Sequence, residues 1–193
     1  MILKNLKGKN IILASKSPRR QSLLRGLDID FEIRTKNIEE SYPAVLKREE
    51  ISLYLSELKA EAFRSELKEN DILITSDTTV HLGENILEKP KDKEEAIDML
   101  TRLAGKTHVV ITAVTLTSPE KQKSFFQETK VTFTQLTNYE IEHYINLYQP
   151  FDKAGSYGVQ EFLGYIGIEK LDGCYYNVMG LPLQKLYREL KTF

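Results

Sequence analysis

The residues best suited to catalysis in this chain are cations and carboxylates spread along its length. They are Arg19, Arg20, Glu40, Lys59, Asp77, Lys89 and Lys153. Cleavage of a phosphate ester or phosphoanhydride needs both kinds of group. Cations and a divalent metal neutralise a polyphosphate, while a carboxylate orients or deprotonates a water molecule. Ligation by oxygen atoms alone fits Mg²⁺ or Mn²⁺, which keep several waters and take one or two carboxylates. Spacing alone does not show that these residues converge, so a solvated surface position is the alternative for each lysine.

Residues 13–20, with the sequence LASKSPRR, connect a predicted strand to a predicted helix. Ser17 is a preferred N-cap residue, and Pro18 is tolerated at the first helical position. The first turn then contains Arg19 and Arg20, although the helix dipole disfavours cations there. Free backbone N–H groups, the dipole and two guanidinium groups together form a strong anion site. A solvated basic first turn is the alternative.

Asp77 and Lys59 are two further candidate site residues, and the interpretation of each depends on the strand or helix in which it lies. Asp77 follows an apolar run in a strand predicted over 72–80, toward the carboxyl end, where ligands bind in open α/β sheets. A turn or capping role is the alternative for Asp77. Lys59 lies at the edge of the buried stripe of a helix predicted over 47–68. A lysine there usually extends to solvent, but it can also point into a cleft.

The remaining patterns alternate between helices and strands in the first half of the chain and include a long hairpin in the middle. The predicted strands are 10–14, 31–35, 72–80, 107–117, 125–133 and 165–171, with a short hairpin over 80–87. The predicted helices are 18–27, 47–68, 92–105, 138–147 and 181–191. A glycine-punctuated, ordered loop is expected over 150–160. The pattern predicts an α/β protein with a mixed sheet and helices on its faces.

Length, net charge and cysteine content limit the number of domains and the classes of partner that the protein can have. The 193 residues suit one domain, with room for two lobes. The formal net charge of −1 gives no global field toward nucleic acid or membrane, and no apolar run reaches membrane-spanning length. Cys174 is the single cysteine, so no internal disulfide can form, which fits a reducing, cytoplasmic setting.

Several other chemistries lack their sequence patterns. The histidines, His81, His108 and His143, are scattered, and Cys174 has no partner at zinc-ligand spacing. A Cys–His nucleophile also lacks a local pattern, and a small buried thiol is the simpler interpretation of Cys174. Neither a Gly-x-x-x-x-Gly-Lys-Ser/Thr loop nor a Gly-x-Gly-x-x-Gly motif after a strand is present.

Six motifs together resemble the signatures of the Maf family of nucleoside triphosphate pyrophosphatases. They occur in order as LASKSPRR at 13–20, SDT at 76–78, EKP at 88–90, TAV at 112–114, DKAGSYGVQ at 152–160 and MGLP at 179–182. The resemblance extends from about Ile11 to the end of the sequence. It implies one domain over residues 1–193 that hydrolyses a nucleoside triphosphate to the monophosphate and pyrophosphate with Mg²⁺ or Mn²⁺. It also implies a fold similar to inosine-triphosphate-cleaving enzymes, with a mixed elongated sheet, two lobes and a central cleft, and a homodimer.

The resemblance also assigns roles to individual residues. Asp77 matches the proton acceptor of the family, and Glu40 matches an acid placed with Asp77 near the metal. The phosphate and nucleotide contacts of the family fall on Ser15, Arg19, Arg20, Lys59 and Lys89.

Base preference within the family follows three positions, occupied here by Arg19, Thr78 and Gln160. All three resemble the dTTP/UTP type rather than the 7-methyl-GTP type, and an amide such as Gln160 can both donate to and accept from a pyrimidine edge. The chain departs from the common pattern at Thr75–Ser76, usually smaller residues, and at Glu161, usually glycine. Two alternatives stay open: a nucleotide-binding regulator of cell division with incidental hydrolysis, and the same reaction on other or modified bases.

Overall fold

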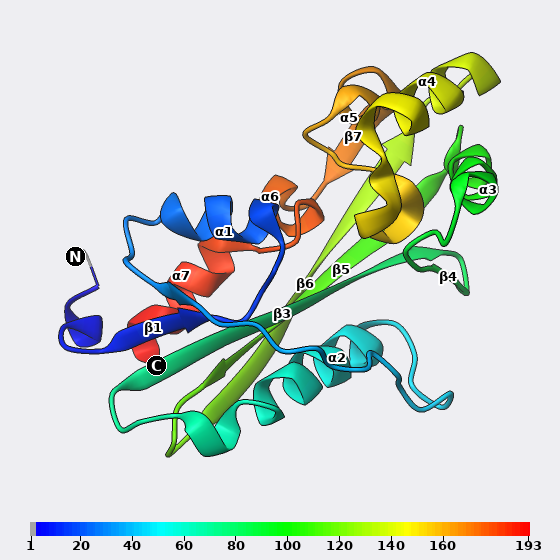
Figure 1. The fold of residues 1–193 in the computed structure, drawn as a ribbon. Helices are drawn as coiled ribbons and strands as arrows, with labels where there is room; N and C mark the ends of the chain where they lie inside the picture. The colour runs from blue at the N-terminus through cyan, green and yellow to red at the C-terminus, as the bar shows by residue number, and fades with distance from the viewer. Residues whose placement is uncertain (1–2) are drawn as a thin grey trace. The chain divides into compact units, whose positions relative to one another are not determined.

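The computed structural model describes residues 3–193, which build one mixed sheet of seven strands (Figure 1). The strands are β1 Asn10–Leu13, β2 Glu32–Ile33, β3 Asp71–Leu82, β4 Asn85–Leu87, β5 Thr107–Thr117, β6 Gln122–Phe133 and β7 Ile168–Asp172. Their order is β2-β1-β3-β5-β6-β7, with β4 paired to β3. β1 runs parallel to both β2 and β3, whereas β4 and β7 are antiparallel to their neighbours.

Seven α-helices accompany the sheet in the described part of the chain. They are α1 Pro18–Arg25, α2 Glu49–Glu61, α3 Lys93–Leu103, α4 Asn138–Tyr148, α5 Phe162–Gly167, α6 Tyr175–Val178 and α7 Leu183–Thr192. The 3₁₀ turns are η1 Lys4–Leu6, η2 Arg64–Glu66, η3 Pro150–Asp152 and η4 Ala154–Ser156. The expected α/β class, a mixed sheet flanked by helices, is confirmed. Across residues 3–193, the helices are too short or too polar to cross a membrane.

Side-chain caps begin several helices, and the cap predicted at Ser17 is confirmed. The Ser17 side chain accepts a hydrogen bond from the backbone N–H of Arg20, and Pro18 opens α1. Asp92 caps α3 by accepting from the backbone N–H of Glu95. The helix predicted over 138–147 was expected to have its cap at Asn138, but the cap of α4 is Thr137, because Thr137 and Glu140 form a reciprocal capping box.

The described chain divides into two compact units. Unit 1 contains the chain up to Asp77, Thr112–Gln127 and Gly180–Phe193, and unit 2 contains Thr78–Ile111 and Glu128–Met179. In unit 1, α2 lies on one side of the strands and α1 and α7 lie on the other (Figure 1). Part of its core joins Ile12 and Leu73 of the sheet to Ala60 of α2 and to Phe63, two residues after that helix ends.

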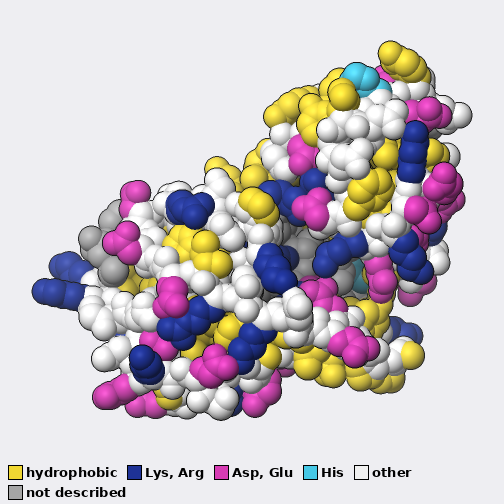
Figure 2. All heavy atoms as spheres, in the orientation of Figure 1, with side chains coloured by type: hydrophobic (Ala, Val, Ile, Leu, Met, Phe, Trp, Pro, Cys, Tyr) yellow, Lys and Arg dark blue, Asp and Glu magenta, His cyan; other side chains and the backbone are white. Residues whose placement is uncertain are grey.

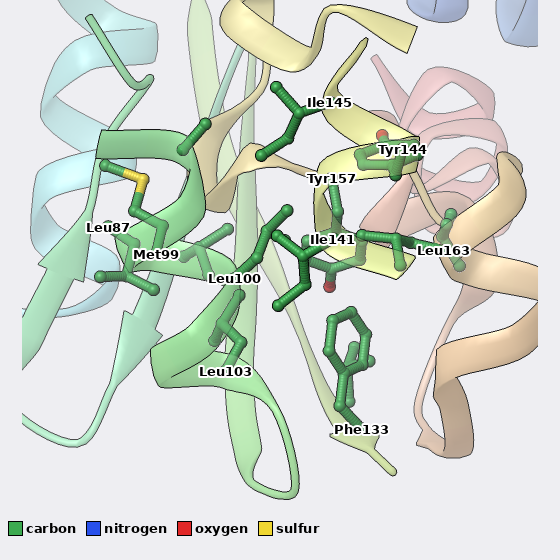
Figure 3. Close-up of a cluster of buried hydrophobic side chains, with 14 of the residues drawn as sticks. Leu87, Met99, Leu100, Leu103, Phe133, Ile141, Tyr144, Ile145, Tyr157 and Leu163 are labelled. Carbon is green, nitrogen blue, oxygen red and sulfur yellow. The ribbon is translucent and has the colours of Figure 1, made fainter. Parts of the chain in front are cut away.

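The core of unit 2 is a larger apolar cluster contributed by α3, α4, α5 and the sheet (Figure 3). Its labelled members are Leu87, Met99, Leu100, Leu103, Phe133, Ile141, Tyr144, Ile145, Tyr157 and Leu163. Tyr157 and Val159 belong to the glycine-punctuated loop and are buried in this cluster. The loop is therefore ordered by its own apolar side chains, as expected.

Two predicted elements differ clearly from the structure in their bounds. The helix predicted over 47–68 forms only at Glu49–Glu61, and a 3₁₀ turn follows at Arg64–Glu66. The strand predicted over 165–171 begins at Ile168, because residues 165–167 belong to α5, whose Leu163 is fully buried. Burial of that side chain overrides the β-like pattern of the residues after it.

Charges of both signs are mixed over the surface of each unit on the face drawn in Figure 2. This distribution agrees with the near-zero net charge of the sequence. Any attraction for an anion must therefore come from a local group of cations.

Candidate functional site

Three of the predicted site residues, Glu40, Lys59 and Asp77, form an ion-pair cluster in unit 1. Lys59 Nζ donates to Asp77 Oδ1 at 2.6 Å and lies 2.9 Å from Glu40 Oε1. The Lys59 side chain is only 13% exposed and that of Asp77 only 8%. Lys59 therefore does not extend to solvent, and the turn or capping interpretation of Asp77 is wrong. Together with Arg20, these residues are called the Asp77 cluster below.

Asp77 owes its position to the unequal lengths of neighbouring strands. β1 ends at Leu13, which pairs with Ile74 of β3, whereas β3 continues to Leu82. Asp77 thus lies in the middle of a 12-residue strand rather than near its carboxyl end. It lies just beyond the carboxyl end of β1, where the parallel neighbour no longer covers the edge of β3. Ligands in open α/β sheets bind beyond the carboxyl ends of parallel strands, and Asp77 lies at such a position. The strand whose end defines this position is β1, not β3.

Arg20 links three segments of unit 1 through backbone carbonyls. Its Nε donates to Gly180 O and its Nη1 donates to Ser76 O, both at 2.8 Å. Ser76 Oγ also donates to Gly180 O, at 3.2 Å. A guanidinium group suits this task because its donors have a fixed fork geometry. Arg20, which the sequence predicted to contact phosphate, thus stabilises the backbone of β3 next to Asp77.

The electrostatics of Arg20 connect it to the rest of the Asp77 cluster. Burial lowers the pKa of Arg20 from its usual value, the Asp77 carboxylate raises it, Arg19 lowers it and Glu40 raises it. The two carboxylates therefore offset part of the cost of burying this cation. Arg20, Glu40, Lys59 and Asp77 thus lie close together within unit 1, and Arg19 adjoins Arg20 in the first turn of α1.

Ser15 lies between β1 and α1 and is buried. Its Oγ accepts a hydrogen bond from the backbone N–H of Ser17, and its carbonyl accepts from Gln21 Nε2. These contacts hold the backbone that enters the basic first turn of α1. The geometry is that of a helix N-terminus with Arg19 and Arg20 in its first turn, as the capping signals predicted.

The residues of the Asp77 cluster fit a hard divalent cation. Glu40 and Asp77 both lie within hydrogen-bond distance of one nitrogen, Lys59 Nζ, so both carboxylates point toward one position for positive charge. Mg²⁺ and Mn²⁺ typically bind one or two carboxylates and complete their coordination with water and substrate oxygens. Among residues 3–193, no group of three or more His, Cys, Asp or Glu side chains gathers into an all-protein metal cage.

Unit 2 holds a second polar group, the Glu161 network, made of Tyr144, Lys153, Gln160 and Glu161. Glu161 accepts hydrogen bonds from the hydroxyl of Tyr144 and from Gln160 Nε2, the latter at 3.2 Å. Lys153 Nζ lies 3.3 Å from Glu161 Oε1 and 2.8 Å from Asp152 Oδ1. The side chain of Gln160, which the family resemblance links to base preference, is therefore held by Glu161.

Glycines let this loop fold tightly. Gly155 has a φ of +71°, and a Cβ on it would lie 3.0 Å from a methyl carbon of Val80. A Cβ on Gly158 would lie 2.6 Å from the carboxyl carbon of Glu161. These glycines thus permit close approach of the loop backbone to neighbouring side chains of unit 2.

Thr78 and Lys89 are the other predicted site residues of unit 2, whereas His108 was not predicted to take part in a site. Thr78 follows Asp77 on β3 and is half-buried, and Lys89 is exposed after β4. His108 on β5 is buried, with its Nε2 2.7 Å from the hydroxyl of Tyr157. Burial lowers the pKa of His108 to about 4, so the ring is neutral at physiological pH.

Sequence reasoning missed the structural consequences of two departures from the family pattern. Thr75 Oγ1 donates to Ser56 O at 2.7 Å, which joins β3 to α2 inside unit 1. Glu161 organises the Gln160 loop, although its only sequence signal was its occurrence at a position where glycine is usual. Tyr144 gave no signal of its polar role, because its helical spacing predicted only burial.

Comparison with known proteins agrees with the motifs. The family model for Maf-like proteins matches residues 10–193. The dTTP/UTP pyrophosphatase of Phocaeicola vulgatus is 51% identical over 191 residues, covering 98% of this chain and 99% of that protein. The protein of the same name from Parabacteroides distasonis is 49% identical over 193 residues, covering both chains in full.

A solved structure shows the same fold at low sequence identity. The Staphylococcus aureus Ham1 protein aligns with a TM-score of 0.54 and 16% identity, covering 94% of this chain and 100% of that one. With the ordered motifs, the full-length relatives and a family match over residues 10–193, the chain belongs to the Maf family.

Proposed function

We propose that this protein is a nucleoside triphosphate pyrophosphatase that hydrolyses dTTP and UTP to the monophosphate and pyrophosphate. The observation that carries the proposal is the Asp77 cluster, in which Lys59 joins Asp77 to Glu40 beside the half-buried Arg20. The names of relatives that are about half identical over their full lengths support the reaction and its substrates. Residues 1–193 act in this proposal as a single catalytic domain.

Asp77 is the proposed general base. Lys59 holds Asp77 Oδ1, and Oδ2 is the atom proposed to take a proton from the water that attacks the α-phosphorus. Fixing the carboxylate in this way keeps the base in one orientation, which general-base catalysis requires. The buried position of Asp77 limits competition from bulk water.

Cations are proposed to carry the charge of the triphosphate. Arg19, Arg20, Lys59 and Lys89 stabilise the leaving pyrophosphate, and Ser15 positions the backbone donors at the start of α1. Glu40 and Asp77 are the proposed ligands of Mg²⁺ or Mn²⁺, which when bound would neutralise phosphate oxygens. Thr78, Gln160 and Arg19 are the proposed determinants of base preference.

The protein is further proposed to work as a homodimer in the cytoplasm. The family resemblance supports the dimer, and the single cysteine is compatible with a reducing compartment. The substrate is the proposed partner, without a requirement for nucleic acid or membrane.

A nucleotide panel tests the proposal directly. Incubation with dTTP, UTP, CTP and 7-methyl-GTP in Mg²⁺ or Mn²⁺ is expected to release pyrophosphate fastest from dTTP and UTP. Preference for 7-methyl-GTP would contradict the base assignment. Tight nucleotide binding without pyrophosphate release would instead favour the regulatory alternative.

A further inference from the structure

Glu161 collects three donors from three parts of unit 2. The hydroxyl of Tyr144 comes from α4, Lys153 Nζ comes from the loop before η4, and Gln160 Nε2 comes from the preceding residue. The Tyr144 hydroxyl in turn accepts a hydrogen bond from the backbone N–H of Gly158 at 3.0 Å. One carboxylate thereby fixes both the backbone of the loop and the side chain of Gln160.

The carboxylate also decides which end of the Gln160 amide faces it. An amide has a donor end, Nε2, and an acceptor end, Oε1, whereas an ionised carboxylate only accepts. Turning the amide around would bring Gln160 Oε1 against Glu161 Oε1, two acceptors without a proton between them. The donor end is therefore engaged by Glu161, at 3.2 Å, and the carbonyl oxygen Oε1 is the end that Glu161 leaves without a bond.

The loop backbone also packs against the donor end of the amide. A Cβ on Gly158 would lie 2.8 Å from Gln160 Nε2, so the backbone of the loop passes directly against the amide. Gln160 Oε1 is buried and has no hydrogen-bond partner among residues 3–193. A buried acceptor without a donor is unfavourable, and a ligand that donates to it recovers that free energy once the covering atoms move aside.

The pyrimidines differ in what they offer such an acceptor. Uracil and thymine carry a proton on N3, so N3 donates, whereas N3 of cytosine carries a lone pair and accepts. We propose that Glu161 is a positioning residue that presents Gln160 Oε1 to the N3–H of uracil or thymine and thereby selects these bases against cytosine. This proposal rests on the proposed function, and it adds a specificity residue that acts through Gln160.

The test compares Glu161→Ala and Glu161→Gln with the wild-type protein on UTP, CTP and N3-methyl-UTP. The wild type is expected to prefer UTP over both others in kcat/KM. Glu161→Ala frees the amide to turn and offer Nε2 to cytosine N3, so the UTP-to-CTP ratio should fall about tenfold, equivalent to about 1.4 kcal/mol. Glu161→Gln keeps one acceptor for Gln160 Nε2 and should retain part of the ratio. Glu169→Ala, an exposed position on β7, is the matched control and should leave the ratio unchanged.

The outcomes separate this inference from the proposed function. An equal loss of kcat/KM on UTP and CTP, together with a lower melting temperature, would show that Glu161 is only structural and would overturn the inference. If the wild type hydrolyses none of the nucleotides, the proposed function fails. Calorimetric titration with UMP and CMP then tests the inference alone: tighter binding of UMP that is reduced about tenfold in Glu161→Ala supports it. Equal affinities, or a difference that the variant retains, overturn it.

Discussion

Lys59 Nζ on α2 donates to Asp77 Oδ1 on β3 at 2.6 Å, inside unit 1. The same nitrogen lies 2.9 Å from Glu40 Oε1. A lysine between two carboxylates links the proposed base to the proposed metal ligand. Much of the proposed chemistry of this protein can be tested through these three side chains and the arginine beside them.

Asp77→Asn should lower kcat by about 10³-fold, because the amide cannot accept the proton of the attacking water. The fold should persist, since asparagine has nearly the same shape. Asp71→Asn is the matched control, because Asp71 is also buried on β3 and accepts hydrogen bonds from Asn10 Nδ2 and the backbone N–H of Lys68. Steady-state kinetics with circular dichroism should show that both variants stay folded and that turnover is lost only in Asp77→Asn. Activity of Asp77→Asn within tenfold of wild type would remove Asp77 from the mechanism.

Glu40→Gln should raise the Mg²⁺ concentration that gives half-maximal activity by about tenfold, as expected when a group at a metal site is lost. At saturating Mg²⁺ the remaining carboxylate, Asp77, should restore most of kcat. Glu39→Gln, an exposed neighbour in the same loop, supplies the control for a change in local charge. Metal titration of both variants is the measurement. An identical Mg²⁺ dependence in the two variants would place Glu40 outside the metal site.

Arg20→Lys should lower the free energy of unfolding by about 1–3 kcal/mol, because lysine cannot bond both Ser76 O and Gly180 O in the fork geometry of arginine. It should also raise KM for the nucleotide. Arg25→Lys, in the last turn of the same helix, is the comparison and should change stability much less. Urea denaturation measures the effect. Wild-type stability in Arg20→Lys would show that the two backbone contacts contribute nothing.

His108 should make stability depend on pH. Its pKa in the folded protein, about 4, lies below the ordinary value of 6.5, so the unfolded chain takes up a proton first as the pH falls. Stability from this group is complete above pH 6.5 and is lost as the pH falls toward 4. Between pH 7.5 and pH 5 the wild type should lose about 2 kcal/mol more than His108→Gln in urea denaturation. Parallel pH profiles for the two proteins would refute the assignment.

Local signals allowed parts of this structure to be predicted from sequence. The start of α1 followed from Ser17 and Pro18, because an N-cap and a first-turn proline act on adjacent backbone groups. The same holds for Asp92 at the start of α3. These interactions do not depend on the rest of the fold.

Other features depend on partners that are distant in sequence. β3 extends to Leu82 because Val80–Leu82 pair with β4, so the position of Asp77 within the strand could not be read from its own apolar run. The network around Glu161 requires Tyr144 of α4, which approaches only when the core of unit 2 has packed. The family motifs identified Asp77 and Gln160 as candidate site residues. Only the folded structure showed that Lys59 bonds to Asp77 and that Glu161 bonds to Gln160.

The central claim is that water attacks the α-phosphorus of dTTP and releases pyrophosphate. Hydrolysis of dTTP in oxygen-18 water with Mg²⁺, followed by mass spectrometry of the products, tests it most directly. The proposed mechanism predicts one heavy oxygen in dTMP and none in the pyrophosphate. Heavy oxygen in pyrophosphate, or the formation of dTDP with labelled orthophosphate, would contradict it.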